Sequence, residues 1–190
     1  MPNSVTNIVV AGLGGQGLVL AGVILAEAAS IYENKNAVQS QSYGPESRGG
    51  ASKSEVIISE SEIDYPKATH IDLLLCLTDA AAEKYLKDCP DTALVLADSD
   101  LVPSDIPARF RSVKAPITRL ARETVGKEFV TNIVALGLIR ELTDIVGVES
   151  LEKAVLGRVP KGTEELNKKA LEVGRSAAHE YGAAVFAAKG

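Results

Sequence analysis

The sequence is poor in aromatic residues and contains no tryptophan. Phenylalanine and tyrosine make up only 4% of it, so a core must be built mainly from Val, Ile, Leu and Ala. Hydrophobic residues account for 46% of the 190 residues and charged residues for 24%, a balance that excludes an intrinsically disordered chain. This length corresponds to about one domain, and we expect a single domain over residues 1–190.

Cysteine and histidine occur only twice each, which argues against the common metal sites. Cys76 and Cys89 are too far apart for a CxxC pair, so the chain offers neither a four-thiolate iron–sulfur site nor a zinc-finger pattern. His70 and His179 have no ligand partners near them in the sequence. We expect no metal on this chain, and we expect reduced thiols of the kind found in cytoplasmic proteins.

The chain also lacks a basic tract and a long apolar run. Its net charge is −5 and its positive charges are dispersed, which argues against nucleic-acid binding as the main function. No apolar run reaches the ~18 residues of a membrane span, and the polar residues 1–7 do not resemble a signal peptide. We therefore expect no nucleic-acid partner, no membrane partner and a cytoplasmic location.

Short apolar runs alternate with helical patterns along the chain. Strands are expected over residues 7–11, 37–41, 55–59, 71–77, 93–97 and 111–114. Helices are expected over 18–32, 80–87, 131–146, 150–156 and 163–181. The alternation predicts an α/β fold, a single Rossmann-like open sheet, mainly parallel and flanked by helices.

Three local features of these elements can be stated in advance. Asp79 is expected to cap the helix over 80–87, and the helix over 131–146 should be buried because it is apolar on nearly every side. Cys76 is expected in the core and Cys89 near an exposed turn. The last helix carries one apolar stripe, formed by Leu166, Ala170, Val173, Ala177 and Tyr181.

A glycine loop lies between the first strand and the first helix. Gly12, Gly14 and Gly17 fit the pattern G-x-G-x-x-G, with Gly15 and Gln16 between them. Glycines let backbone N–H groups approach a phosphate, and the helix N-terminus adds partial positive charge. The loop therefore predicts a phosphate-bearing ligand. The alternative is a loop that only packs tightly, or that meets the backbone of another subunit.

A nicotinamide dinucleotide fits this sequence poorly. Its site needs an acidic residue about 20 residues after the glycine loop, to hold the ribose hydroxyls. Residues 38–41 have no acid, and no basic residue that could replace it for a 2′-phosphate occurs before Arg48. A free-standing nucleotide-binding oxidoreductase is therefore the less favoured alternative.

A second loop, SYGPESRGG over residues 42–50, is the most unusual stretch. Arg48 can form paired hydrogen bonds with a carboxylate or phosphate, and the glycines beside it allow close approach of the backbone. Because both loops follow predicted strands, they can border one crevice at the carboxyl ends of the strands. The alternative is a solvated turn with a local contact between Glu46 and Arg48. The candidate binding residues of this loop are Ser42, Tyr43, Gly44, Arg48, Gly49 and Gly50.

Several segments together carry a family resemblance. They read AGLGGQG at 11–17, QSQSYGPESRGGASKSEVIIS at 39–59, IDYP at 63–66, NIVALGL at 132–138 and ELNKKALEVG at 165–174. This set resembles the gamma subunit of 2-oxoacid:ferredoxin oxidoreductases. The form of the second loop, with EVIIS and IDYP after it, leans toward the 2-oxoglutarate branch of that family.

The resemblance implies a role within a larger enzyme. Such a complex cleaves a 2-oxoacid with thiamine diphosphate, forms an acyl-CoA and CO2, and passes electrons through iron–sulfur clusters to ferredoxin. Thiamine diphosphate, Mg²⁺ and the clusters then belong to partner subunits, and this chain has no catalytic residue of its own. Its implied part is to help enclose the active site and to bind coenzyme A.

Coenzyme A is compatible with the two loops. The glycine loop suits its pyrophosphate, and Arg48 or Lys53 suits its 3′-phosphate. Asn132 begins the later resembling helix, where it either caps that helix or points into the crevice. A third reading is a scaffold whose glycine loops only pack against partner subunits.

Overall fold

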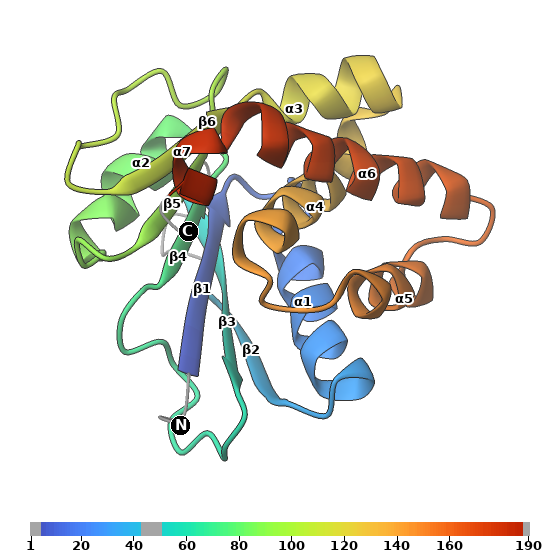
Figure 1. Cartoon of the computed structure of the whole chain (residues 1–190), viewed down its shortest axis with the longest axis horizontal. Coiled ribbons are helices and arrows are strands. Elements are labelled where there is room, and N and C mark those ends of the chain that lie inside the picture. The colour runs from blue at the N-terminus through green and yellow to red at the C-terminus, as the bar shows by residue number, and fades with distance from the viewer. Residues whose placement is uncertain (1–4, 43–50, 188–190) are drawn as a thin grey trace.

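The computed structural model describes residues 5–42 and 51–187 (Figure 1). Within these residues the sheet has six strands in the order β2-β3-β1-β4-β5-β6. The strands are β1 (Val5–Gly12), β2 (Asn36–Ser42), β3 (Ser52–Ser59), β4 (Leu73–Cys76), β5 (Leu94–Asp98) and β6 (Arg111–Ala115). Strands β1, β4, β5 and β6 are parallel, whereas β3 pairs antiparallel with both β1 and β2. The predicted open and mainly parallel α/β sheet is confirmed.

The helical segments cover both faces of the sheet. They are α1 (Leu18–Tyr32), α2 (Asp79–Tyr85), η1 (Leu86–Asp88), α3 (Ile117–Arg119), η2 (Leu120–Val125), η3 (Glu128–Val130), α4 (Thr131–Thr143), α5 (Val148–Arg158), α6 (Glu164–Tyr181) and α7 (Ala183–Ala187). Helices α1, α4, α5 and α6 lie on one face, and α2 lies on the other (Figure 1). No helix of the described segments is long and apolar enough to span a membrane.

Strand β1 lies inside the sheet and is buried on both faces. Ile8 and Val10 join the core beneath α1 and α4, whereas Val9 and Ala11 join the core beneath α2. Successive side chains of a strand point to opposite faces, so a strand covered on both sides needs a continuous apolar run. This is the physical reason for the run that predicted the strand, and it places the following glycine loop at the carboxyl edge of the sheet.

Helix α4 is buried, as predicted, but the buried face of α6 differs from the predicted stripe. Tyr181 is 38% exposed, and Leu166 and Val173 are only partly buried. Ala170 and Ala177 of the stripe are buried, and the other buried residues of α6 are Asn167, Leu171, Gly174 and Ala178. The two helices approach so closely that small residues form the contact, and the larger apolar side chains lie at its margin.

Two smaller predictions are wrong. Thr78, not Asp79, caps α2, because its side chain accepts a hydrogen bond from the backbone N–H of Ala81. The Asp79 carboxylate instead accepts hydrogen bonds from the hydroxyl and backbone N–H of Ser104. Cys89 is buried rather than exposed, because it packs in the core beneath α2.

Candidate functional site

The glycine loop connects β1 to α1 at the point where the chain changes direction across the sheet. After β1 the chain crosses to β2 and β3 on one side, and it then returns to β4 on the other side. Gly15 and Gly17 have φ angles of +91° and +73°, a left-handed conformation that favours glycine. Ligands of open α/β sheets bind at this topological switch point, beyond the carboxyl ends of the strands.

The side chain of Gln16 folds back onto the loop. Its Oε1 accepts a hydrogen bond of 2.7 Å from the backbone N–H of Leu13, and its Nε2 donates to the carbonyl of Leu77 at 3.4 Å. Both polar ends of Gln16 are thus bonded within the protein. The sequence placed Gln16 among the ligand-binding candidates, and the structure gives it these internal contacts.

Asn132 reaches the same loop from α4. Its Nδ2 donates to the carbonyl of Gly17 at 3.3 Å, and its Oδ1 accepts from the backbone N–H of Ile133 at 3.0 Å. Only 4% of Asn132 is exposed, and the N-cap position of α4 belongs to Val130. The sequence left open whether Asn132 caps its helix or points into the crevice. In the structure its side chain joins α4 to the backbone of the glycine loop.

A concavity of about 490 Å³ lies beside the loop and the beginning of α1. Its lining includes Gly14, Gly15, Gly17, Leu18, Lys53 and Arg158. A Cβ added to Gly14 or Gly15 would meet no atom of residues 5–42 and 51–187 within 4 Å, so this stretch of backbone is open toward the described part of the chain. The structure therefore brings together Gly14, Gly15 and Gly17 of the predicted site at one hollow surface.

The first turn of α1 borders the same concavity. Gly17 occupies the N-cap position, no side chain caps the helix in the described structure, and the first turn holds no acidic residue. The first N–H groups of an α-helix have no partner within the helix. An uncapped N-terminus beside an open glycine loop is chemically suited to a phosphate group.

Two basic side chains line the concavity, and each is paired with a carboxylate. Lys53 Nζ lies 2.5 Å from Glu55 Oε1 and 5.4 Å from the centre of the Tyr85 ring. Arg158 donates from Nε to both carboxylate oxygens of Glu27, at 2.9 and 2.8 Å, and a second guanidinium nitrogen contacts the same carboxylate.

The partner of Arg158 explains why sequence reasoning missed this residue. Hydrogen bonding from Arg158 holds the pKa of Glu27 below its usual range. The pair joins α5 to α1 across 131 positions of the sequence, and no local pattern marks so distant a contact. Because both basic groups of the concavity are already neutralised, the backbone N–H groups are its free anion-binding groups among the described residues.

The ends of the second loop return to the glycine loop. Ser42 ends β2 opposite Lys53, and Ser52, the first residue of β3, pairs with Gly12. Ser52 also lines the concavity, whereas Ser42 is exposed and is not among the lining residues. The other candidates in this loop lie outside the described residues: Tyr43, Gly44, Arg48, Gly49 and Gly50.

A second concavity, of about 360 Å³, lies on the other side of the loop. Gly15, Gln16, Thr118, Arg122 and Phe129 contribute to its lining. Thr118 is only 9% exposed, and its hydroxyl is buried with no hydrogen-bond partner among the described residues. The backbone N–H of Thr118 donates to Asp98, a fully buried carboxylate at the end of β5. No local pattern in the sequence predicts a role for Thr118 or Asp98.

The position where a dinucleotide site would have its ribose-binding acid is occupied by amide and hydroxyl side chains. Gln39, in β2, donates its amide to the Ser54 hydroxyl at 3.0 Å, which ties β2 to β3. Among the described residues no cluster of His, Cys, Asp and Glu could hold a metal ion. The amide at this position, in place of an acid, does not favour a nicotinamide-dependent dehydrogenase.

Comparison with known proteins identifies the family. The family model described as pyruvate ferredoxin/flavodoxin oxidoreductase matches residues 7–177. The chain belongs to this family. It is 53% identical over 171 residues to the 2-oxoglutarate synthase subunit KorC of Methanocaldococcus jannaschii, a match that covers 89% of this chain and 91% of that subunit.

Solved structures of the family agree with this fold. The gamma subunit of a keto/oxoacid ferredoxin oxidoreductase from Geobacter sulfurreducens is 51% identical, with a TM-score of 0.84 over 92% of this chain and 99% of that one. A 2-oxoglutarate:ferredoxin oxidoreductase from Magnetococcus marinus, solved with 2-oxoglutarate, coenzyme A and succinyl-CoA bound, has a TM-score of 0.81. At 21% identity, and with 93% of this chain matching 31% of that one, the second likeness shows the fold alone.

Proposed function

We propose that this chain is the gamma subunit of a 2-oxoglutarate:ferredoxin oxidoreductase. The observation that carries this function is the 53% identity to a KorC subunit over nearly the full length of both chains. The complex converts 2-oxoglutarate, coenzyme A and two oxidised ferredoxins to succinyl-CoA, CO2, a proton and two reduced ferredoxins. A free-standing nucleotide-binding oxidoreductase is not favoured, since the chain matches subunits of multi-subunit enzymes.

Within this complex the chain contributes a binding surface. We place the pyrophosphate of coenzyme A at the open backbone of Gly14 and Gly15 and the uncapped first turn of α1, because these groups offer N–H donors to an anion. Arg48 is proposed as a further phosphate partner on its sequence context alone. We propose none of the described residues as a catalytic group. The proposed role of the chain is to bind and orient coenzyme A and to help enclose the active site.

The redox chemistry is assigned to partner subunits. Thiamine diphosphate and Mg²⁺ supply the chemistry that cleaves the 2-oxoacid, and iron–sulfur clusters carry the electrons. The two cysteines of this chain are free, buried thiols, and they offer no cluster ligation. Buried free thiols are also consistent with the cytoplasmic location that we propose for the complex.

Reconstitution from separately purified subunits tests this function. Methyl viologen reduction should require 2-oxoglutarate, coenzyme A and this chain together, and it should be much slower with pyruvate. The purified chain alone should be colourless and silent in the same assay. Full activity of the remaining subunits without this chain, or turnover by this chain alone, would contradict the proposal.

The ligand of this chain is tested separately from the turnover of the complex. Isothermal titration of the purified chain with coenzyme A and with NADH distinguishes the proposed ligand from a nicotinamide dinucleotide. Heat from NADH alone would favour the free-standing oxidoreductase. No heat from either ligand, together with loss of activity when the chain is omitted, would favour a scaffold that only packs against its partners.

A further inference from the structure

We infer that Gln16 and Asn132 are positioning residues that fix the backbone of the glycine loop, and that they do not themselves contact the ligand. The inference rests on the proposed coenzyme A site. It distinguishes the residues that face the ligand from the residues that support the loop. Gly14 and Gly15 form the open side toward the concavity. Gln16 and Asn132 support the loop through its backbone.

Gln16 joins the ends of two parallel strands. Leu77, whose carbonyl accepts from Gln16 Nε2, follows directly after β4, and its backbone N–H donates to the carbonyl of Ala11 in β1 at 2.9 Å. Gln16 Oε1 holds the N–H of Leu13, two residues beyond Ala11. One amide side chain therefore sets the position of the loop relative to both β1 and β4. Both polar ends of the side chain already bond within the protein, so we assign Gln16 to support of the loop.

Asn132 fixes the other end of the loop. The carbonyl of Gly17 accepts from Asn132 Nδ2 and also from the backbone N–H of Ala21, the first hydrogen bond within α1. Asn132 therefore holds the residue that sets the direction of the uncapped helix N-terminus. Because this side chain is almost fully buried, its amide is directed at the loop backbone rather than at solvent.

The spacing of the glycines supports this division. A Cβ on Gly12 would lie 2.3 Å from Gln16 Oε1, and a Cβ on Gly17 would lie 2.5 Å from Asn132 Nδ2. At position 12 a larger side chain would displace the Gln16 amide, and at position 17 it would meet the Asn132 amide and would also need a positive φ. At Gly14 and Gly15 an added Cβ would meet no atom of the described residues within 4 Å, so crowding there does not account for glycine. The φ of +91° accounts for glycine at position 15, and close approach of a ligand accounts for it at position 14.

Conservative substitutions change single hydrogen bonds at the loop. Asn132→Asp keeps the acceptor for the N–H of Ile133 and adds a favourable negative charge in the first turn of α4. It also removes the donor to Gly17 and places a carboxylate near that carbonyl. Gln16→Glu keeps the acceptor for Leu13, which makes the shorter of the two bonds, and loses only the longer bond to Leu77.

Kinetics of the reconstituted complex provide the first test. Gln16→Ala and Asn132→Asp should each raise the KM for coenzyme A by roughly 3- to 10-fold, the equivalent of one lost hydrogen bond. The KM for 2-oxoglutarate should stay unchanged, and Gln16→Glu should recover part of the loss. Asn132→Asp should also lower the melting temperature, because its carboxylate is buried beside the Gly17 carbonyl, so Gln16→Ala is the variant that tests positioning most directly. Gln39→Ala is the matched control, because its amide bonds to Ser54 in the neighbouring β-hairpin and should leave the KM for coenzyme A unaltered.

Amide hydrogen exchange of the full-length chain provides a test that does not require turnover. Gln16→Ala should speed exchange at the N–H of Leu13 by at least about tenfold, while amides of β5 keep their wild-type rates. Unchanged exchange at Leu13, or unchanged KM values for coenzyme A in both variants, would overturn the inference. A third outcome is faster exchange at Leu13 in Gln16→Ala together with a complex whose activity does not require coenzyme A. That outcome would support the positioning role of Gln16 and would contradict the proposed function.

Discussion

Gly137 of α4 and Gly174 of α6 face each other where the two helices are closest. A Cβ on Gly174 would lie 3.0 Å from Cα of Gly137 and 2.0 Å from the carbonyl oxygen of Val134. A Cβ on Gly137 would lie 2.2 Å from the carbonyl oxygen of Leu171. The backbones of the two helices are therefore in direct contact, and this contact fixes the position of α4 relative to α6. It also fixes the position from which Asn132 of α4 reaches the glycine loop.

Gly174→Ala should destabilise the chain by about 2–3 kcal/mol, because the added methyl group overpacks against a helix backbone that cannot shift locally. This loss should exceed the gain of up to ~1 kcal/mol that alanine normally brings to a helix. Urea unfolding followed by circular dichroism measures the difference.

Gly157→Ala is the matched control for this prediction. Gly157 lies in α5, and the nearest atom to an added Cβ is the hydroxyl of Tyr32 at 3.9 Å, an ordinary contact. This variant should gain roughly 0.5–1 kcal/mol from helix propensity alone. Equal effects of the two substitutions would show that the α4–α6 contact is looser than the structure indicates.

The same contact explains where sequence reasoning succeeded and failed for the fold. Buried strands such as β1 and the largely apolar helix α4 follow from runs of large apolar residues, and both were predicted. For α6 the predicted stripe was right at Ala170 and Ala177 and wrong at Tyr181, because the rule assigns the largest apolar residues to the core. At a close helix crossing the buried positions belong to small residues such as Gly174, and their role depends on a partner helix distant in sequence.

The candidate site divides in the same way. Local spacing predicted the glycine loop, and its place between β1 and α1 is confirmed. The partners of Gln16 and Asn132 depend on how Leu77 and Gly17 are brought near them, which no local pattern encodes. Arg158 reaches the concavity only through the packing of α5 on α1, so the sequence did not indicate it.

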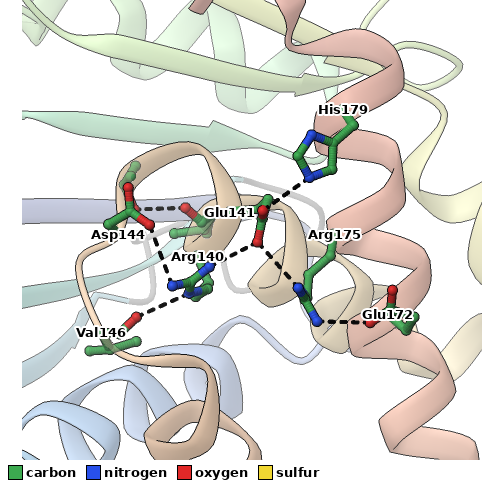
Figure 2. Close-up of polar contacts among 9 residues, drawn as sticks. Arg140, Glu141, Asp144, Val146, Glu172, Arg175 and His179 are labelled. Atoms are coloured by element: carbon green, nitrogen blue, oxygen red, sulfur yellow. Dashed lines mark hydrogen bonds and ion pairs between the residues drawn. The ribbon is translucent and has the colours of Figure 1, made fainter. Parts of the chain in front are cut away.

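Glu141 of α4 is the centre of a charged network that joins α4 to α6 (Figure 2). Its carboxylate accepts from Arg140 at 2.8 Å, from Arg175 at 3.2 Å and from His179 at 3.0 Å. Burial raises the pKa of Glu141, but hydrogen bonds from Arg175 and Arg140 lower it by more, so the pKa lies below its usual range. Only 14% of the Glu141 side chain is exposed, which limits screening by water.

Glu141→Gln should therefore lower stability in a pH-dependent way. A carboxyl whose pKa is depressed by folding stabilises the protein above its unfolded pKa of about 4.3, and that stabilisation disappears as the pH falls through the folded pKa. The variant should be less stable than wild type by roughly 1–2 kcal/mol at pH 7, and the difference should shrink below about pH 4.

Unfolding in urea between pH 7 and pH 3.5 measures this dependence. Repeating the comparison in a His179→Asn background removes the contribution of the imidazole that faces Glu141. A difference that stays constant with pH would mean that Glu141 contributes packing rather than charge.

Thr118→Val should stabilise the free chain by up to about 1 kcal/mol. A buried hydroxyl without a partner carries a desolvation cost that the valine methyl group does not. Thr131→Val is the control, because the Thr131 hydroxyl donates to the carbonyl of Glu128 at 2.6 Å and the residue is only 5% exposed. That variant should lose about 1 kcal/mol. Thermal melts of both variants check the contrast, which fails if Thr118→Val also lowers the melting temperature.

Gly14→Val should impair the assembled enzyme while leaving the free chain folded. Gly14 has no positive φ, and an added Cβ would meet no atom of the described residues within 4 Å, so we expect the fold to accept a side chain there. Its side chain would occupy the open surface where we place the phosphate groups, and it would keep an anion from the loop's N–H groups. The KM for coenzyme A should rise at least about tenfold, the equivalent of losing one charge-assisted hydrogen bond, while the melting temperature of the free chain changes little.

Gly17→Ala is the contrasting variant for this last prediction. Gly17 has a φ of +73°, and a Cβ there would meet the Asn132 amide, so the free chain itself should be destabilised. Melting temperatures of the two free chains and coenzyme A kinetics of the two complexes give four measurements. Wild-type kinetics in Gly14→Val would remove the open side of the loop from the binding site. A fall in melting temperature in both variants would instead mean that all the glycines of the loop serve packing.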